Sequence, residues 1–161
     1  MNKQIELQQP RLETRGTLLI AGLREHYTSE TGQNIPALWQ RFVPHIGNVP
    51  GQIGRKAYGV CSKKSSDTDG FDYLSGVEVA DFSSISDELS RISIPAQRYL
   101  VFPHLEHVSR LGDTVGAIFY QWLPASEHQA AHEPDFFELY GEKFDPQTGR
   151  GDIEVWVPIK S

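Results

Sequence analysis

One carboxylate in this sequence stands between aromatic residues in a short apolar segment. Residues 136–140 read Phe-Phe-Glu-Leu-Tyr, a composition typical of a strand, in which alternate side chains point to opposite faces. Phe136, Glu138 and Tyr140 would then share one face. Burial there raises the pKa of a carboxyl group unless a cation or a hydrogen bond compensates. Glu138 could therefore hold a flat cation stacked on the rings, or act as a general base toward water.

Tyr58 is the second residue whose position suggests chemistry. It precedes Glu138 by 80 residues, in a segment, 55–63, that aligns without a gap on residues 135–143. A tyrosine that faces the carboxylate across a groove could donate a hydrogen bond to it or protonate a leaving group. Two plainer interpretations stay open. The sheet face could be exposed to water, with Glu138 an ordinary surface acid, and Tyr58 could be a core or edge tyrosine.

Other aromatic residues could supply stacking surface for a ligand. Trp39 belongs to an apolar stripe of helical spacing, Ile35, Leu38, Trp39 and Phe42, which predicts one buried helix face. Trp39 could therefore equally be core, as could Tyr120. Tyr73 and Trp156, on strand-like segments, fit either a cleft or the core. The chosen ligand-binding candidates are Glu138, Tyr58, Tyr140, Trp39, Tyr120, Trp156 and Phe136. Glu138 and Tyr58 would be catalytic only if the protein is a hydrolase.

The elements that must position these residues repeat at the same spacing of 80, since residues 35–44 align on 115–124. The first half predicts a strand within 11–28, a helix over 35–43 and strands over 56–61 and 71–79. The second half predicts a strand over 97–107, a helix over 113–123 capped by Asp113, and strands over 136–144 and 153–159.

This order predicts an α+β fold made of two β-α-β-β half-modules. The half-modules span about residues 11–80 and 95–160, and a polar linker covers about 81–94. We expect a pseudo-two-fold axis, antiparallel sheet, one main helix per half and a ligand cleft between the halves.

Composition limits the kind of protein. The 161 residues suit one domain, and a net charge of −6 argues against direct binding to nucleic acid. Cys61 is the single cysteine, so no intrachain disulfide forms and a reducing cytoplasm is the expected location. No apolar run is long enough for a membrane helix. His128 and His132 lie four apart but in an expected loop, and we expect neither a metal nor a cofactor.

Several motifs together resemble a known family. The second half opens with IPAQRYLVFPHLEHV, continues with FFELYGEKFDP and ends with IEVWVPIK. With the repeated β-α-β-β pattern, these resemble the GyrI-like small-molecule-binding domain, which is the effector-binding domain of many AraC- and MerR-class transcription regulators. The resemblance covers nearly all of residues 11–160. The turns HYTSE and HVSRL depart from it, because they lack a Gly-Pro-Tyr common there.

The resemblance implies an aromatic cleft around a buried acidic residue that binds small lipophilic, often cationic molecules. It places that acid at Glu138 and the cleft aromatics at or near Trp39, Tyr58, Tyr120 and Tyr140. We expect a stand-alone domain without its own DNA-binding segment. Two alternatives stay open: a hydrolase of electrophilic cyclopropane-type molecules that uses Glu138 and Tyr58, and an interaction protein whose partner is DNA gyrase or a separate regulator.

Overall fold

A computed structural model describes residues 6–28, 30–63 and 70–160 of the chain. Within these residues, eight strands form one antiparallel sheet in the order β1-β6-β8-β7-β3-β4-β2-β5. The strands are β1 (Arg11–Arg15), β2 (Leu18–Tyr27), β3 (Ala57–Ser62), β4 (Phe71–Glu78), β5 (Ser90–Ile94), β6 (Gln97–His104), β7 (Phe136–Tyr140) and β8 (Ile153–Ile159). With helices on one face of this antiparallel sheet, the predicted α+β class is confirmed.

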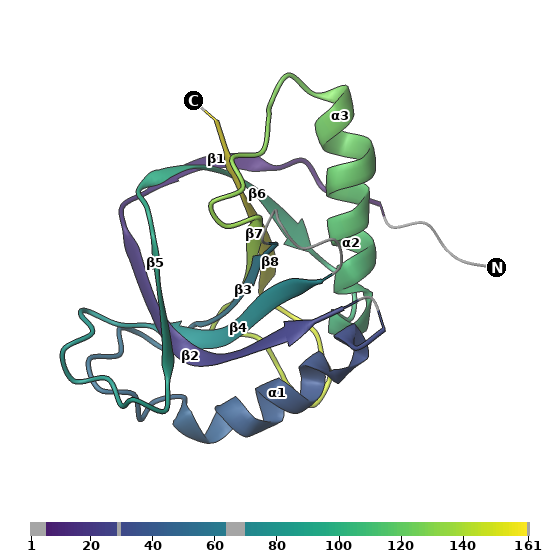
Figure 1. The fold of residues 1–161 in the computed structure, drawn as a ribbon. Coiled ribbons are helices and arrows are strands. Elements are labelled where there is room, and N and C mark those ends of the chain that lie inside the picture. Colours follow the sequence, from purple (N-terminus) through teal and green to yellow (C-terminus); the bar gives the residue numbers. More distant parts are fainter. Residues whose placement is uncertain (1–5, 29, 64–69, 161) are drawn as a thin grey trace.

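Two long bent stretches of chain, β1 followed by β2 and β5 followed by β6, bring the edges of the sheet together into a barrel-like ring (Figure 1). β1 pairs with β6, beginning at Arg11 opposite Val101, while β2 pairs with β5, beginning at Leu18 opposite Ile94. Only residues 16–17 separate β1 from β2, and only residues 95–96 separate β5 from β6. The same two stretches of chain therefore pair on both sides of the bend, so the two ends of the strand order meet there.

Side chains on the inner face of this ring fill it. They come from strands on every side and form one buried apolar cluster, made of Leu18, Ile20, Tyr58, Val60, Leu74, Ile94, Tyr99, Val101, Phe137, Leu139 and Trp156. Alternate residues of the same strands point to the outer face, toward the helices. The sheet is thus buried on both faces, and neighbouring residues of β7 belong to different environments.

The first helix, α1 (Ile35–Phe42), packs on the outer face of β2 and β4. Its apolar stripe buries Leu38 and Phe42, as the spacing predicts. The helix ends before Pro44, which lacks an N–H and lies in the short 3-10 turn Val43–His45. Within the described residues, no helix is long and apolar enough to span a lipid bilayer.

The second helical segment covers the outer face of β6 and β8. It runs from α2 (Leu111–Ala117) through a π-helical turn (Ile118–Trp122) into α3 (Leu123–Ala125). It begins two residues earlier than predicted, and Asp113 lies in its first turn without capping it. A 3-10 turn, Val108–Arg110, leads into α2, and His107 caps this turn, because its Nδ1 accepts a hydrogen bond from the Ser109 N–H at 3.0 Å.

Two parts of the chain differ from the predicted elements. The expected polar linker contains β5, in which Ile92 and Ile94 alternate with polar residues as an edge strand requires. The first predicted strand is two strands, β1 and β2, that pair with different partners. Outward from β3 the sheet runs β4, β2, β5, and outward from β7 it runs β8, β6, β1. That order agrees with two β-α-β-β halves, while duplication and a pseudo-two-fold axis stay predictions.

Candidate functional site

Strand β7 places Glu138 on the outer face of the sheet, between β3 and β8. Glu138 lies opposite Gly59 of β3 and opposite Val155 of β8. Phe136 and Tyr140 share its face because side chains alternate along the strand. The predicted arrangement of these three residues is therefore present. Glu138 is only 9% exposed, so it is not the surface acid of the plainer interpretation.

Three aromatic residues hold the Glu138 carboxylate, and we call these four residues the outer carboxylate cluster: Trp39, Tyr73, Glu138 and Tyr140. The Tyr73 and Tyr140 hydroxyls both donate to Glu138 Oε1, at 2.6 and 2.9 Å. The Trp39 indole N–H in turn donates to the Tyr73 hydroxyl oxygen at 2.9 Å. The carboxylate thus receives donors from two strands, and helix α1 supports one of them.

Burial dominates the electrostatics of the outer carboxylate cluster. It raises the pKa of Glu138 from 4.5 to about 7, against the opposing effect of the two tyrosine hydrogen bonds. Burial likewise raises the pKa values of Tyr73 and Tyr140 well above the ordinary range, so both hydroxyls keep their protons and donate. None of the ion pairs between described residues involves Glu138. In the described part of the chain, the side-chain donors to this carboxylate are therefore two neutral hydroxyls.

Gly59 makes room for the hydrogen bond between Tyr73 and Glu138. A Cβ at position 59 would lie 2.6 Å from Glu138 Oε1 and would collide with the Tyr73 hydroxyl. Residue 59 is directly opposite Glu138, so any side chain there would point onto the carboxylate. A glycine in this strand therefore marks the close approach of two polar side chains.

Trp39 covers the outer carboxylate cluster from helix α1. Its indole meets the Tyr140 ring edge to face, with centroids 5.3 Å apart, and meets Tyr73 in the same way at 6.5 Å. Phe136, at the start of β7, is half-buried against Phe119 of the second helical segment, with centroids 5.9 Å apart. Aromatic side chains from both helices thus close over the strand that carries the carboxylate.

Tyr58 does not face Glu138, contrary to the sequence prediction. It pairs with Leu139 in the β3–β7 ladder and points to the inner face, where its hydroxyl contacts Arg15 Nη1 at 3.3 Å and Glu78 Oε1 at 3.5 Å. The gap-free spacing of 80 aligned Tyr58 with Glu138, but the residue opposite Glu138 is Gly59. The alignment of the two segments was thus off by one residue from the actual pairing, and a shift of one residue places a side chain on the opposite face of the sheet.

The remaining candidate residues lie in different places on the molecule. Trp156 lies on the inner face, stacked on Phe137 with centroids 5.4 Å apart and an interplanar angle of 14°. Tyr120 is 84% exposed and contributes to neither group. Tyr73, for which the sequence left both a cleft and the core open, donates a hydrogen bond to Glu138, as Tyr140 does. The pairing of Tyr73 with Cys61, two residues after Gly59, puts it on the outer face.

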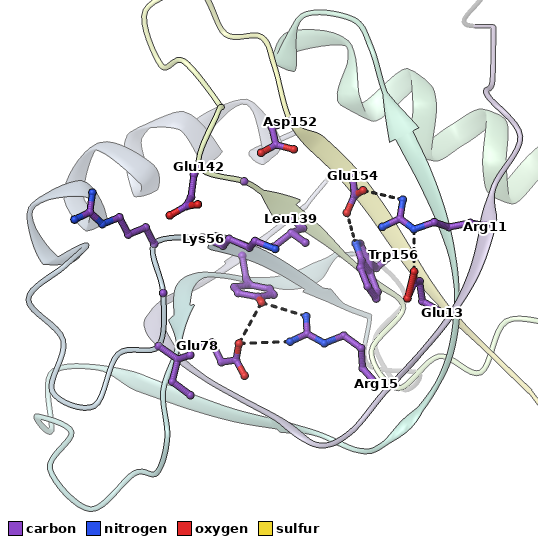
Figure 2. A pocket seen from close by; sticks show the side chains of 15 residues that line it. Arg11, Glu13, Arg15, Lys56, Glu78, Leu139, Glu142, Asp152, Glu154 and Trp156 are labelled. Carbon is purple, nitrogen blue, oxygen red and sulfur yellow. Dashed lines mark hydrogen bonds and ion pairs between the residues drawn. The ribbon is translucent and has the colours of Figure 1, made fainter.

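The inner face carries a separate pocket of about 600 Å³ at one mouth of the ring (Figure 2). Tyr58, Leu139 and Trp156 line it together with charged residues of β1 and of the segment before β3. Leu139 follows Glu138 in sequence, yet the two side chains lie on opposite sides of the sheet. The pocket and the outer carboxylate cluster are therefore distinct.

A family model described as Cass2, integron-associated effector binding protein, matches residues 11–159. The transcriptional regulator BrlR of Pseudomonas aeruginosa is 26% identical over 151 residues, which cover 92% of this chain and 54% of BrlR. The chain thus spans about half the length of the curated relative that it matches.

Two solved structures have the same fold. SAV2435 bound to tetraphenylphosphonium superposes with a TM-score of 0.76 at 20% identity, covering 96% of this chain and 95% of that one. An integron cassette protein from the mobile metagenome of Vibrio cholerae gives a TM-score of 0.66 at 16% identity, with 96% and 97% covered.

Proposed function

The chain belongs to the Cass2 family of integron-associated effector binding proteins, and we propose that it binds a lipophilic cation with Glu138 as the counter-charge. Family membership confirms the GyrI-like resemblance and an effector-binding domain of the transcription-regulator type. The tetraphenylphosphonium bound by SAV2435 supports the class of ligand, a large apolar cation, as a proposal for this chain.

The observation that carries the proposal is a buried carboxylate whose hydrogen-bond donors, among the described residues, are two neutral tyrosine hydroxyls. Glu138 loses most of its hydration and receives two tyrosine hydrogen bonds in exchange, which leaves its pKa near 7. A cation beside it would stabilise the ionised form directly, because attraction between charges is strong where water is excluded. The rings of Tyr73, Tyr140 and Trp39 would contact the apolar body of the same ligand.

Entry of such a ligand requires the covering side chains to move. Glu138 is 9% exposed, and the indole of Trp39 rests on both tyrosine rings. A flat aromatic group could take the place of this indole and keep edge-to-face contact with Tyr140. The Trp39 indole N–H would lose its bond to the Tyr73 hydroxyl in that exchange, which makes it a reporter of binding.

The test is a titration with tetraphenylphosphonium followed by the indole N–H signals of ¹⁵N-labelled protein. We expect the Trp39 signal to shift, and Glu138→Gln to weaken binding by at least about tenfold. Glu88→Gln removes the same charge from an exposed position and serves as the matched control. Equal affinity of the Glu138→Gln variant and the control would reject Glu138 as the counter-charge.

The hydrolase alternative required Glu138 and Tyr58 to act together, and these two residues do not lie on the same face of the sheet. A carboxyl group with a pKa near 7 suits a general base, but Tyr58 lies on the opposite face from Glu138. Binding without turnover is therefore the proposed function. Association with DNA gyrase or with a separate regulator stays a prediction, for which a pull-down with purified gyrase is the direct test.

A further inference from the structure

Strand β4 carries a buried hydroxyl group, that of Ser75, which no other group of the protein satisfies. The residue is 0% exposed, and among the described residues its Oγ is the buried polar side-chain atom that has no hydrogen-bond partner. Burying a hydroxyl without a partner costs free energy, and natural structures contain few such groups. The presence of Ser75 therefore needs a reason other than the hydrogen bonds of the folded chain.

Packing accounts for a small residue at position 75 but not for a polar one. Tyr73 and Val77 share its face of β4, and both belong to buried apolar clusters. Across the sheet, Ser75 lies opposite Leu23 of β2 and Gly59 of β3. Alanine has nearly the same size as serine and would avoid the cost of the unpaired hydroxyl in these surroundings.

Ser75 and Glu138 lie in the same row across the sheet. Gly59 is opposite Ser75 in the β3–β4 ladder and opposite Glu138 in the β3–β7 ladder. Two strand spacings therefore separate Ser75 from Glu138, which places their backbones about 10 Å apart. Both side chains point to the outer face, and the glycine between them has no side chain. One ligand with several aromatic rings can span both residues.

Trp39 packs against the two apolar clusters that flank Ser75. One of these clusters contains Tyr73 and the other contains Val77, and the indole contacts both clusters. The proposed entry of a cation requires this indole to leave the rings of Tyr73 and Tyr140. The same movement would open the part of the outer face on which Ser75 lies.

We propose that Ser75 is a specificity-determining residue of the site at Glu138, and that the ligand is a lipophilic cation whose apolar body carries a hydrogen-bonding group. The charge of the ligand lies at Glu138, and its polar group meets the Ser75 hydroxyl, which can both donate and accept. This inference rests on the proposed function, because it needs a ligand in the place of the Trp39 indole.

The energetic reason is that Ser75 has already lost its hydration in the folded protein. A ligand that bonds to this hydroxyl gives up only the hydration of its own polar group, so the new hydrogen bond adds to affinity. A purely hydrocarbon cation such as tetraphenylphosphonium leaves the hydroxyl unpaired and gains nothing from it. The site should therefore distinguish two cations of equal charge and shape by one polar atom.

The probes are two tetraphenylphosphonium derivatives that differ at one ring. One carries a para hydroxymethyl group and the other a para ethyl group, so charge and shape match and only the first can bond to Ser75. Calorimetry at pH 8, above the Glu138 pKa of about 7, measures both affinities. We expect Ser75→Ala to lower the ratio of hydroxymethyl to ethyl affinity by about fivefold, through weaker binding of the hydroxymethyl probe alone.

Ser62→Ala is the matched control for Ser75→Ala. Ser62 is a half-buried strand serine that shares the inner face with Val60, so its substitution should leave the affinity ratio unchanged. Urea denaturation should show Ser75→Ala to be at least as stable as the wild type, because the hydroxyl has no partner among the described residues. A clear loss of stability would overturn the proposal, since the hydroxyl would then have a structural bond.

The outcome for Ser75 can be told apart from the outcome for Glu138. If Glu138→Gln weakens both probes while Ser75→Ala leaves their ratio unchanged, the cation site stands and the role of Ser75 is overturned. A trapped water that hydrates the Ser75 hydroxyl would give that same unchanged ratio. If the wild type binds neither probe, the proposed function and the role of Ser75 both fail.

Discussion

Glu138 changes its protonation state close to neutral pH, and this should appear directly in ligand binding. Its pKa of about 7 means that the cluster holds a neutral acid below that pH and a carboxylate above it. A permanently charged cation prefers the carboxylate, so binding at lower pH must first remove a proton. Tetraphenylphosphonium affinity should therefore rise by about tenfold per pH unit up to pH 7 and level off above it.

Calorimetric titrations between pH 5.5 and pH 8.5 would measure this dependence, and the cation itself does not titrate. In Glu138→Gln the same series should be flat, because no carboxyl group remains to lose its proton. A wild-type profile as flat as that of the variant would show that Glu138 is not the group that senses the ligand.

Gly59 is the residue whose substitution should damage the outer carboxylate cluster most specifically. In Gly59→Ala the added methyl group would lie 2.6 Å from Glu138 Oε1 and against the Tyr73 hydroxyl, so one of them must move. We expect a loss of about 1–3 kcal/mol in the free energy of unfolding, as for other overpacked positions. Cation affinity should fall as well.

Gly116→Ala is the matched control for Gly59→Ala. Position 116 lies in α2, and a Cβ there would meet nothing closer than Tyr120 at 3.9 Å. Because alanine favours helix over glycine, this control should be neutral or slightly stabilising. Urea denaturation of both variants gives the comparison, and similar losses in the two would contradict the role assigned to Gly59.

At the level of elements, the buried side chain of His104 connects strand β6 to α2 through a hydrogen bond with Thr114. His104 Nε2 lies 2.8 Å from the His107 carbonyl oxygen, which can only accept, so Nε2 carries the proton. Nδ1 is then the acceptor for the Thr114 hydroxyl at 2.7 Å. Burial lowers the pKa of His104, which keeps the ring neutral and this pattern of donors intact.

Thr114→Val should break this connection without changing the volume of the side chain. It leaves Nδ1 of His104 buried without a donor, which costs about 1–3 kcal/mol in the free energy of unfolding. Thr114→Ser keeps the hydroxyl and should restore most of that loss. Chemical denaturation at pH 8, where histidine is neutral in the unfolded chain also, measures both variants. A valine variant as stable as the serine variant would contradict this account.

The whole molecule should unfold as one unit although its sequence reads as two halves. β3 of the first half pairs with β7 of the second, and β1 pairs with β6 in the same way. The inner apolar cluster also takes residues from both halves, such as Tyr58 and Trp156. Neither half can therefore expose its strands without disrupting the other.

Fluorescence and backbone circular dichroism should accordingly give the same urea midpoint. Trp39 reports the first half and the outer face, while Trp156 reports the second half and the inner face. Single-tryptophan variants that retain one or the other separate the two signals. Midpoints that differ between these variants, beyond their own stability changes, would indicate half-modules that unfold independently.

Sequence alone determined the local features of this protein. Alternation along residues 136–140 placed Phe136, Glu138 and Tyr140 on one face, and helical spacing predicted that Leu38 and Phe42 are buried. Both patterns depend only on the period of a strand or a helix, which a sequence displays directly. The family resemblance also implied that Glu138 is buried, which strand propensity alone could not indicate.

The tertiary structure alone decided which tyrosine contacts Glu138 in addition to Tyr140 of the same strand. That choice depends on the register of β3 against β7, where Gly59, and not Tyr58, lies opposite the carboxylate. Because of this difference of one residue, Tyr58 lines the pocket on the inner face, and Tyr73 of β4 contacts Glu138 on the outer face. Register is fixed by the packing of the whole ring, because each strand must match neighbours far away in sequence. A local pattern therefore found the carboxylate and placed Tyr140 beside it, but could not identify Tyr73, in the distant strand β4, as the second donor.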